Sequence, residues 1–157
     1  MLSLFLWRRD LLKSIVKDVE IRFFAHATED PNLVLNAVSM VLPSNILESV
    51  KPKRIDLRGH HGNPISLYRI LFKKEEDVEA VLRCLSENLS DDDKETLAGH
   101  ATLHVGDGSL YLRLDKQKAL TGEFSLCHED PIRIRIRFRR RKPEAIIEAS
   151  KALGLML

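Results

Sequence analysis

The chain has 157 residues, of which 44% are hydrophobic and 31% are charged, and its formal net charge is +2. This length and composition fit one folded domain with a substantial core, and they exclude a fibrous or low-complexity chain. Cys84 and Cys127 form no paired motif. We therefore expect neither a disulfide framework nor a cysteine zinc site, and we expect a reducing, cytoplasmic location.

Residues 1–18 contain a short apolar run followed by two arginines. The run is too short to span a bilayer, and it lacks the leading charge and cleavage site of a secretory signal. Later apolar residues continue it at helical spacing. We expect an extension that forms an amphipathic helix for docking or dimerisation; a mis-chosen start codon explains it about as well, and a membrane-surface helix is a third alternative. Residues 19–157 are then a single domain with no membrane partner.

The first half of the domain alternates strands and helices. Asp30 is a good N-cap, and Pro31 suits the first helical position. Two glycines and an Asn-Pro pair predict a turn between two strands. The predicted elements are a strand over 19–28, a helix over 31–41, a strand around 55–57, a turn over 59–64 and a strand over 65–72.

The second half begins with helices and continues with strands. Gly106-Asp107-Gly108 is a hairpin signal, because Asp-Gly tolerates positive φ. The predicted elements are helices over 74–89 and 90–99, strands over 101–105 and 109–114, a helical turn over 116–120, a strand around 124–126, a strand from 131 and a helix from 143. Hairpin connections dominate, so we expect an α+β two-layer sandwich: a mostly antiparallel sheet with helices packed on one face.

The most informative stretch is residues 131–142, where apolar and cationic residues alternate with period two. Its six Arg and one Lys give +7, so the rest of the chain carries −5. The apolar set faces the core, and neighbours in the opposite row lie about 7 Å apart along the strand. The members of that row are Arg133, Arg135, Arg137, Arg139 and Arg141.

Such a row has two interpretations. Unpaired guanidiniums repel one another, and an anionic polymer removes that repulsion, because the planar fork of Arg can donate two bonds to a phosphate. Alternatively, the arginines pair with acidic neighbours or stay solvated. The charge asymmetry favours binding to a polyanion. Low aromatic content argues against base stacking as the main mode and favours contacts with the backbone of structured RNA.

Two polar loops are further candidates. His60, His61 and Asn63 lie in a glycine-flanked turn, which either contacts a ligand or simply supplies the backbone angles. The second candidate set lies at the end of a strand and in the turn after it: Tyr111, Arg113, Asp115, Lys116, Gln117 and Lys118. Alternatively, Asp115 only caps the turn and pairs with a neighbouring arginine. We predict that the two loops lie near one another at one end of the sheet and extend the arginine surface into a single RNA-binding site. Capping explains the run from His26 to Asp30 better than a site does.

Four stretches carry distinctive residues: Phe24-Ala-His-Ala-Thr-Glu-Asp30, Gly59-His-His-Gly-Asn-Pro64, Leu110 to Ala119, and Asp130-Pro-Ile-Arg-Ile-Arg135. Together they resemble an archaeal family described as RNA-binding proteins or predicted exosome subunits. The resemblance covers roughly residues 19–154. It implies a fold similar to that of a ribosomal protein that binds ribosomal RNA. A comparison with double-stranded-RNA-binding domains fits less well, because their α-β-β-β-α order lacks strands expected here.

No enzyme signature, cofactor motif or metal-ligand spacing stands out, and the resemblance supplies no catalytic residue. We therefore interpret the chain as a non-catalytic RNA-binding protein that works beside exosome-like or other RNA-processing machinery. The first alternative is a protein–protein adaptor or homodimer whose arginines meet an acidic patch such as Asp91–Asp93. The second is an RNA-cleaving or RNA-modifying enzyme that uses His26, His60 or His61.

Overall fold

A six-stranded sheet forms the centre of the computed structural model, which describes residue 12 and residues 15–157. All of its strand pairs are antiparallel, in the order β2-β3-β1-β6-β5-β4. The strands are β1 (Val16–Ala25), β2 (Lys53–Arg58), β3 (Pro64–Phe72), β4 (Val105–Gly106), β5 (Ser109–Asp115) and β6 (Pro131–Phe138).

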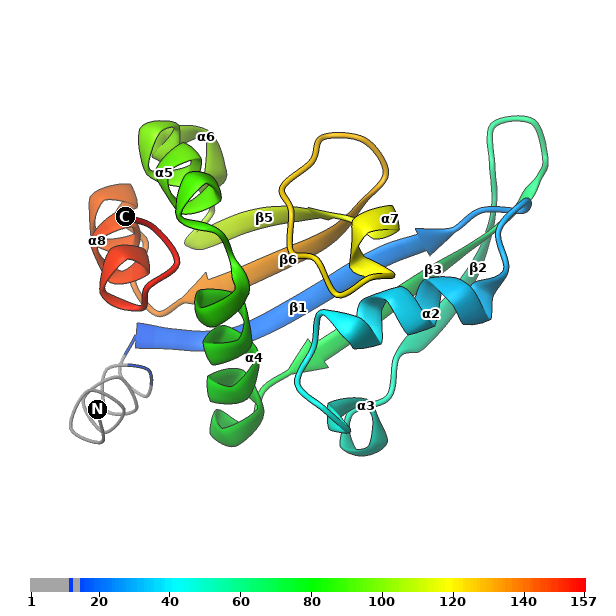
Figure 1. Ribbon diagram of the computed structural model, residues 1–157, viewed down its shortest axis with the longest axis horizontal. Helices are drawn as coiled ribbons and strands as arrows, with labels where there is room; N and C mark the ends of the chain where they lie inside the picture. The colour runs from blue at the N-terminus through cyan, green and yellow to red at the C-terminus, as the bar shows by residue number, and fades with distance from the viewer. Residues whose placement is uncertain (1–11, 13–14) are drawn as a thin grey trace.

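The helices pack on one face of this sheet, which confirms the predicted α+β two-layer sandwich. Figure 1 shows α2, α4 and α7 in front of the strands, while α5, α6 and α8 gather where β5 begins. The helices are α2 (Pro31–Met40), α3 (Ile46–Ser49), α4 (Glu75–Asn88), α5 (Asp91–Gly99), α6 (Ala101–His104), α7 (Lys116–Ala119) and α8 (Pro143–Ala152). We call the face away from these helices the outer face.

The core lies between the sheet and the helices, and the two central strands build most of its floor. In β6 the alternate residues Ile132, Ile134 and Ile136 are at most 2% exposed. Val19 and Ile21 of β1 lie directly opposite two of them and are fully buried. Each such aliphatic side chain contributes about 1.5–3 kcal/mol when it is fully buried. The period-two pattern therefore fixes which face of the sheet is covered.

Several local predictions are confirmed by the geometry of turns and caps. Asp30 caps α2, because its Oδ1 accepts a hydrogen bond from the backbone N of Asn32 at 2.9 Å. The β4–β5 hairpin turns through Asp107 at φ 50° and Gly108 at φ 72°. Positive φ at both central residues is what a two-residue turn with the twist of the strands requires.

Two predicted strands are wrong. Residues 101–104 form helix α6 rather than a strand, and only Val105 and Gly106 pair with β5. A strand would have turned Leu103 inward, whereas it is 80% exposed. Around residues 124–126 a single bridge joins Leu126 to Leu114. Beyond this bridge the chain leaves β5 and turns toward β6, which begins at Pro131.

Strand β1 begins at Val16, three residues before the predicted start. Val16 pairs with Phe138 and Asp18 pairs with Arg137, with a register shift between them. The helix predicted over residues 1–18 falls mostly outside the described residues, and the division into an extension and a domain stays a prediction. Over residue 12 and residues 15–157, no helix combines the length and apolar character needed to cross a bilayer.

Candidate nucleic-acid interface

Five cations stand directly opposite one another across five strands of the outer face. The register pairs Arg113 of β5 with Arg133 of β6, Arg133 with Arg22 of β1, Arg22 with Arg69 of β3, and Arg69 with Lys53 of β2. All five residues are exposed. Because neighbouring strands lie about 4.8 Å apart, the set spans about 19 Å across the sheet. We call Arg113, Arg133, Arg22, Arg69 and Lys53 the basic row.

Acidic groups compensate this row only in part. Glu20 Oε2 accepts from Arg69 Nη2 at 2.6 Å, and Glu20 Oε1 lies 3.8 Å from Arg22 Nε. Among the described residues no carboxylate pairs with Arg113 or Arg133. Like charges directly opposite one another on a sheet destabilise it by several tenths of a kcal/mol per pair. The fold therefore carries an electrostatic cost at the centre of its outer face, and a bound polyanion would relieve it.

The arginines further along β6 are compensated, as the acidic-neighbour interpretation allowed. Arg137 donates to Asp18 Oδ1 from Nε at 2.7 Å, and its Nη2 bonds Oδ2 of the same carboxylate. Asp18 is 1% exposed, and its hydrogen bond raises the pKa of the Arg137 guanidinium. Arg135 donates to Ser109 Oγ at 3.0 Å and lies 5.7 Å from the ring centroid of Tyr111. Arg133 is thus the least compensated cation of the strand.

Arg139 and Arg141 do not continue the row, which corrects the predicted set of five along one strand. Strand β6 ends at Phe138, after which the chain leaves the sheet toward α8. The backbone N of Arg139 donates to Ile15 O at 2.6 Å, and the Cγ of Arg141 lies beside the β4–β5 turn. The alternation of apolar and cationic residues also ends at Phe138, because residues 139–142 are all cationic, so the sequence itself marks the end of the strand.

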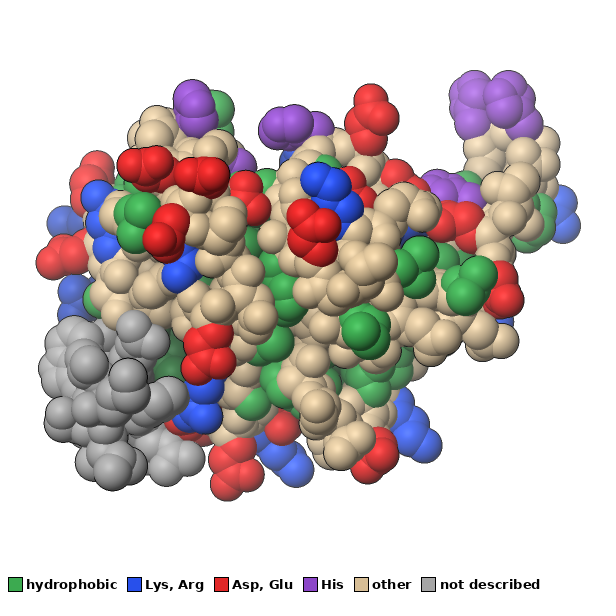
Figure 2. All heavy atoms as spheres, in the orientation of Figure 1, with side chains coloured by type: hydrophobic (Ala, Val, Ile, Leu, Met, Phe, Trp, Pro, Cys, Tyr) green, Lys and Arg blue, Asp and Glu red, His purple; other side chains and the backbone are tan. Residues whose placement is uncertain are grey.

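The turn between β2 and β3 projects from the sheet as an exposed hairpin. A Cβ added to Gly59 would lie 2.8 Å from Ile65 Cδ1, and Gly62 has φ +79°. Gly62 is therefore explained by its backbone conformation, and Gly59 by the closeness of the Ile65 side chain. His60, His61 and Asn63 are exposed, and Figure 2 shows histidine side chains at the tip of this hairpin. These side chains are accessible from solvent, and no described acidic group orients the two imidazoles.

Lys116 is buried, which corrects the expectation of an exposed phosphate contact. It is 5% exposed, and its Nζ donates to Phe24 O at 2.7 Å, lies 3.1 Å from Glu29 Oε1 and lies 2.8 Å from Asp130 Oδ2. His26 Nε2 lies 2.9 Å from Asp130 Oδ1. We call Lys116, Glu29, Asp130 and His26 the lysine clamp. It joins the end of β1, the start of α7 and the start of β6.

The neighbouring residues Gln117 and Lys118 remain exposed. The backbone N of Lys118 donates to Asp115 Oδ1 at 3.0 Å, so Asp115 caps α7, in line with the alternative interpretation of this loop. The turn after β2 and the turn after β5 lie at the same end of the sheet, because β2 and β5 both finish where β1 finishes. Strands β1 and β6 separate them. The two loops thus share one end of the sheet, as predicted, but they do not adjoin each other, and a single site formed by both stays a prediction.

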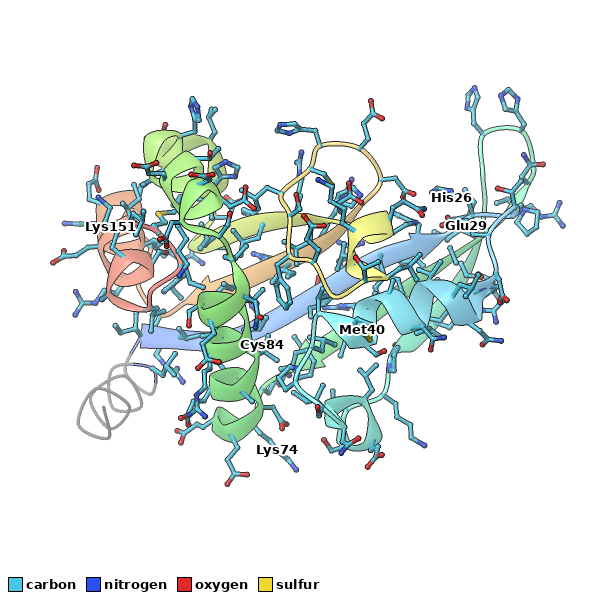
Figure 3. All side chains as sticks on the ribbon, viewed as in Figure 1. His26, Glu29, Met40, Lys74, Cys84 and Lys151 are labelled. Carbon is cyan, nitrogen blue, oxygen red and sulfur yellow. The ribbon has the colours of Figure 1, made fainter. Side chains whose placement is uncertain are left out.

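The sequence analysis missed the lysine clamp, although three of the four resembling stretches contain its members. His26, Glu29 and Asp130 offer ligand atoms within 4.8 Å of one another, the arrangement of a metal site. The Lys116 ammonium, however, already sits against both carboxylates. A metal ion would have to displace this internal cation, so the cluster is better explained as a structural element. Figure 3 labels His26 and Glu29 at the point where β1 passes into α2.

Comparison with known proteins identifies the family of this chain. The profile of a family described as RNA binding matches residues 18–138, the span that contains the whole basic row and the lysine clamp. The chain belongs to this RNA-binding family. An RNA-binding protein of Pyrococcus abyssi is 36% identical over 137 residues, which cover 84% of this chain and 89% of the relative.

Solved structures of family DUF54 show the same fold. A protein of Archaeoglobus fulgidus superposes with a TM-score of 0.76 at 27% identity and covers 88% of this chain and 99% of its own. A DUF54 protein from Methanothermobacter thermautotrophicus gives a TM-score of 0.72 at 25% identity, with 88% and 98% coverage. The family and its fold are thereby established for this chain.

Replacing Lys116 by Met should destabilise the fold, because two carboxylates and a carbonyl oxygen lose their cation. Breaking a fully buried ion pair costs about 3–5 kcal/mol, and the partial exposure of Glu29 and Asp130 reduces this to about 2 kcal/mol. Urea unfolding followed by circular dichroism measures the change. The exposed Lys118→Met variant is the control and should change stability by less than about 0.5 kcal/mol. Equal effects of the two substitutions would refute a clamp.

The lysine clamp should also make stability depend on pH. Partial burial disfavours the charged form of Asp130, but hydrogen bonds from Lys116 and His26 outweigh it and lower the pKa of this carboxyl. The ionised Asp130 therefore contributes its full stabilisation of the folded state above the pKa of the unfolded chain, about 3.9. This stabilisation is lost as the pH falls through the lowered pKa of the folded state.

The matched variant is Asp130→Asn, since Asn also tolerates the φ of +41° at this position. Between about pH 5 and pH 2 the wild-type free energy of unfolding should fall more steeply than that of the variant. Parallel curves from urea titrations at each pH would show that Asp130 contributes no such linkage.

Proposed function

We propose that this protein binds RNA by docking the phosphate backbone on its outer sheet face, through the basic row. The observation that carries the proposal is the direct cross-strand alignment of four arginines and a lysine, of which Arg113 and Arg133 have no acidic partner among the described residues. Arginine suits this task because its planar fork matches phosphate oxygens bidentately. Membership of the RNA-binding family supports the assignment of the polyanion as RNA.

The direction of the basic row gives the proposed path of the RNA. The row runs perpendicular to the strands, whereas the sequence had suggested a track along β6. Toward the far end of β6 the charges are neutralised by Asp18, so a strand of RNA crossing from β5 to β2 meets more uncompensated charge than one following β6. Contacts of this kind read the shape and backbone of RNA rather than its sequence.

The proposed role is binding without catalysis, in the cytoplasm. His26 is held against Asp130 in the lysine clamp, and the exposed His60 and His61 contact only each other among the described residues, with ring centroids 5.1 Å apart. The unpaired Cys84 and Cys127 suit a reducing compartment. The sequence stretches that resemble predicted exosome subunits support one further part of the proposal. The protein would work together with an assembly that processes or degrades RNA.

A protein adaptor with an acidic partner has less support. The acidic run suggested as its counterpart, Asp91–Asp93, opens helix α5 behind the Ser90 cap. Carboxylates at a helix start are stabilised by the helix dipole, and Asp93 also accepts from the backbone N of Leu126 at 3.3 Å. The run is therefore explained within the fold. A homodimer built on the arginine face would place two uncompensated cationic surfaces together.

Replacing Arg22, Arg113 and Arg133 together by Gln should weaken RNA binding across sequences. The log–log slope of affinity against salt should become shallower by about 0.7–0.9 for each phosphate that the variant no longer neutralises. Fluorescence anisotropy with a labelled hairpin RNA, at several salt concentrations, measures both quantities. The variant should be at least as stable as the wild type, because removing opposed like charges relieves repulsion.

The matched control removes the same charge elsewhere. Arg139, Arg140 and Arg141 lie beyond β6 and are all exposed, and their triple Gln variant changes net charge by the same amount. It should keep most of the affinity and of the salt slope. If both triple variants weaken binding equally, diffuse attraction by net charge explains the affinity, and a site at the basic row is contradicted.

Purified protein should not cleave RNA, with or without a divalent metal ion. The reason is that none of the described histidines belongs to the basic row, and the carboxylate beside the row, Glu20, is held in an ion pair with Arg69. Incubation with end-labelled hairpin RNA, resolved on a denaturing gel, checks this. Cleavage that disappears in a His60→Ala, His61→Ala double variant would overturn the non-catalytic assignment.

A further inference from the structure

A hollow of about 330 Å³ adjoins the basic row on the outer face, between β1, β6 and β5. Its polar lining comes from two neighbouring rows of the sheet: Arg22, Arg133 and Arg113 in the basic row, and Glu20, Arg135 and Tyr111 in the next. The side chains of Leu112 and Ile134 point to the core, so backbone forms the floor. The hollow thus combines cations, one carboxylate and one aromatic ring.

The carboxylate distinguishes this hollow from a phosphate site. The Glu20 side chain is 11% exposed, and Arg69 engages its Oε2 from Nε at 2.8 Å and from Nη2 at 2.6 Å. Arg22 Nε lies 3.8 Å from Oε1, too far for a hydrogen bond. Among the described residues none donates a hydrogen bond to Oε1, so this oxygen can still accept one from a ligand. A phosphate placed directly against Oε1 would be repelled, whereas a neutral group with an N–H donor would be attracted.

The aromatic ring supplies a stacking surface. Tyr111 is half-buried and lies opposite Arg135, whose guanidinium is 5.7 Å from the ring centroid. Unpaired bases of RNA are commonly held between aromatic rings and guanidinium planes, with their edges hydrogen-bonded by side chains. Tyr111 and Arg135 offer both kinds of plane beside the path proposed for the backbone.

We propose that the hollow takes one unpaired nucleobase that carries an exocyclic amino group. Tyr111 stacks on the base, Glu20 Oε1 accepts from the amino group, and Arg135, which lies outside the basic row, donates to a ring nitrogen or a carbonyl oxygen. The arginines of the basic row keep their contacts with the adjoining phosphates. Guanine, adenine and cytosine meet this requirement, and uracil does not. The inference rests on the proposed function, and it adds local base selection to binding that is otherwise indifferent to sequence.

The test uses otherwise identical hairpin RNAs with one unpaired position that is G, A, C, U or abasic. Fluorescence anisotropy of the full chain at fixed salt gives the affinity for each. The abasic RNA should bind at least about fivefold more weakly than the amino-bearing bases, because stacking on an aromatic side chain is worth about 1–3 kcal/mol. Uracil should fall between them.

Three variants assign the effects to residues. Tyr111→Ala should abolish the difference between base and abasic RNA, while Tyr111→Phe retains it. Glu20→Gln should narrow the gap between the amino-bearing bases and uracil. Arg69→Gln, which breaks the same ion pair from the other side, should weaken binding to all the RNAs while keeping their order.

The outcomes separate this inference from the proposed function. Equal affinity for all the RNAs, with a normal salt dependence, would overturn the base site and leave the basic row as the RNA site. An absence of salt-dependent binding to any of the RNAs would overturn the proposed function itself. The affinities for the different RNAs are first compared with the wild-type protein alone. The test therefore remains valid even if one of the variants fails to fold.

Discussion

The pairing of β1 with β6 determines both faces of this protein. On the inner face it sets Val19 and Ile21 against the isoleucines of β6, and so closes the core. On the outer face the same register sets Asp18 against Arg137 and Arg22 against Arg133. A slip of one residue would bury the charges and expose the aliphatic side chains. The strongly apolar inner face therefore holds the unfavourable arginine pairs of the outer face in place.

The charge of the outer face changes from neutral to positive along β1. Asp18 and Glu20 neutralise the part of the sheet near the start of that strand, and Arg22 leaves the part near its end positive. Figure 2, which views the opposite, helix-bearing side, shows cationic and acidic side chains interspersed, with no continuous basic surface. The modest net charge of the chain thus conceals a positive band on one face. Under the proposed function, this distribution would direct a polyanion to one place rather than to the whole surface.

The sequence predicted the fold class and most elements, because these depend on local signals. Period-two alternation identified the strands, and Asp30, Pro31 and the Asp107-Gly108 turn marked their connections. The site depends on register between distant strands, which no local pattern contains. Arg22, Arg69 and Lys53 became members of the basic row only through strand pairing. Lys116 looked like a surface residue because its partners, Glu29 and Asp130, are remote in the chain.

The two edge strands of the sheet differ in length, but both have features that discourage pairing with another molecule. At one edge β4 has only two residues, and at the other every residue of β2 is exposed. Lys53, Arg54 and Arg58 put cations along that exposed edge. Short edge strands and edge charges are the features by which natural sheets resist extension by a strand of another molecule. A protein of this design can keep a broad open sheet face for a ligand without its edges templating aggregation.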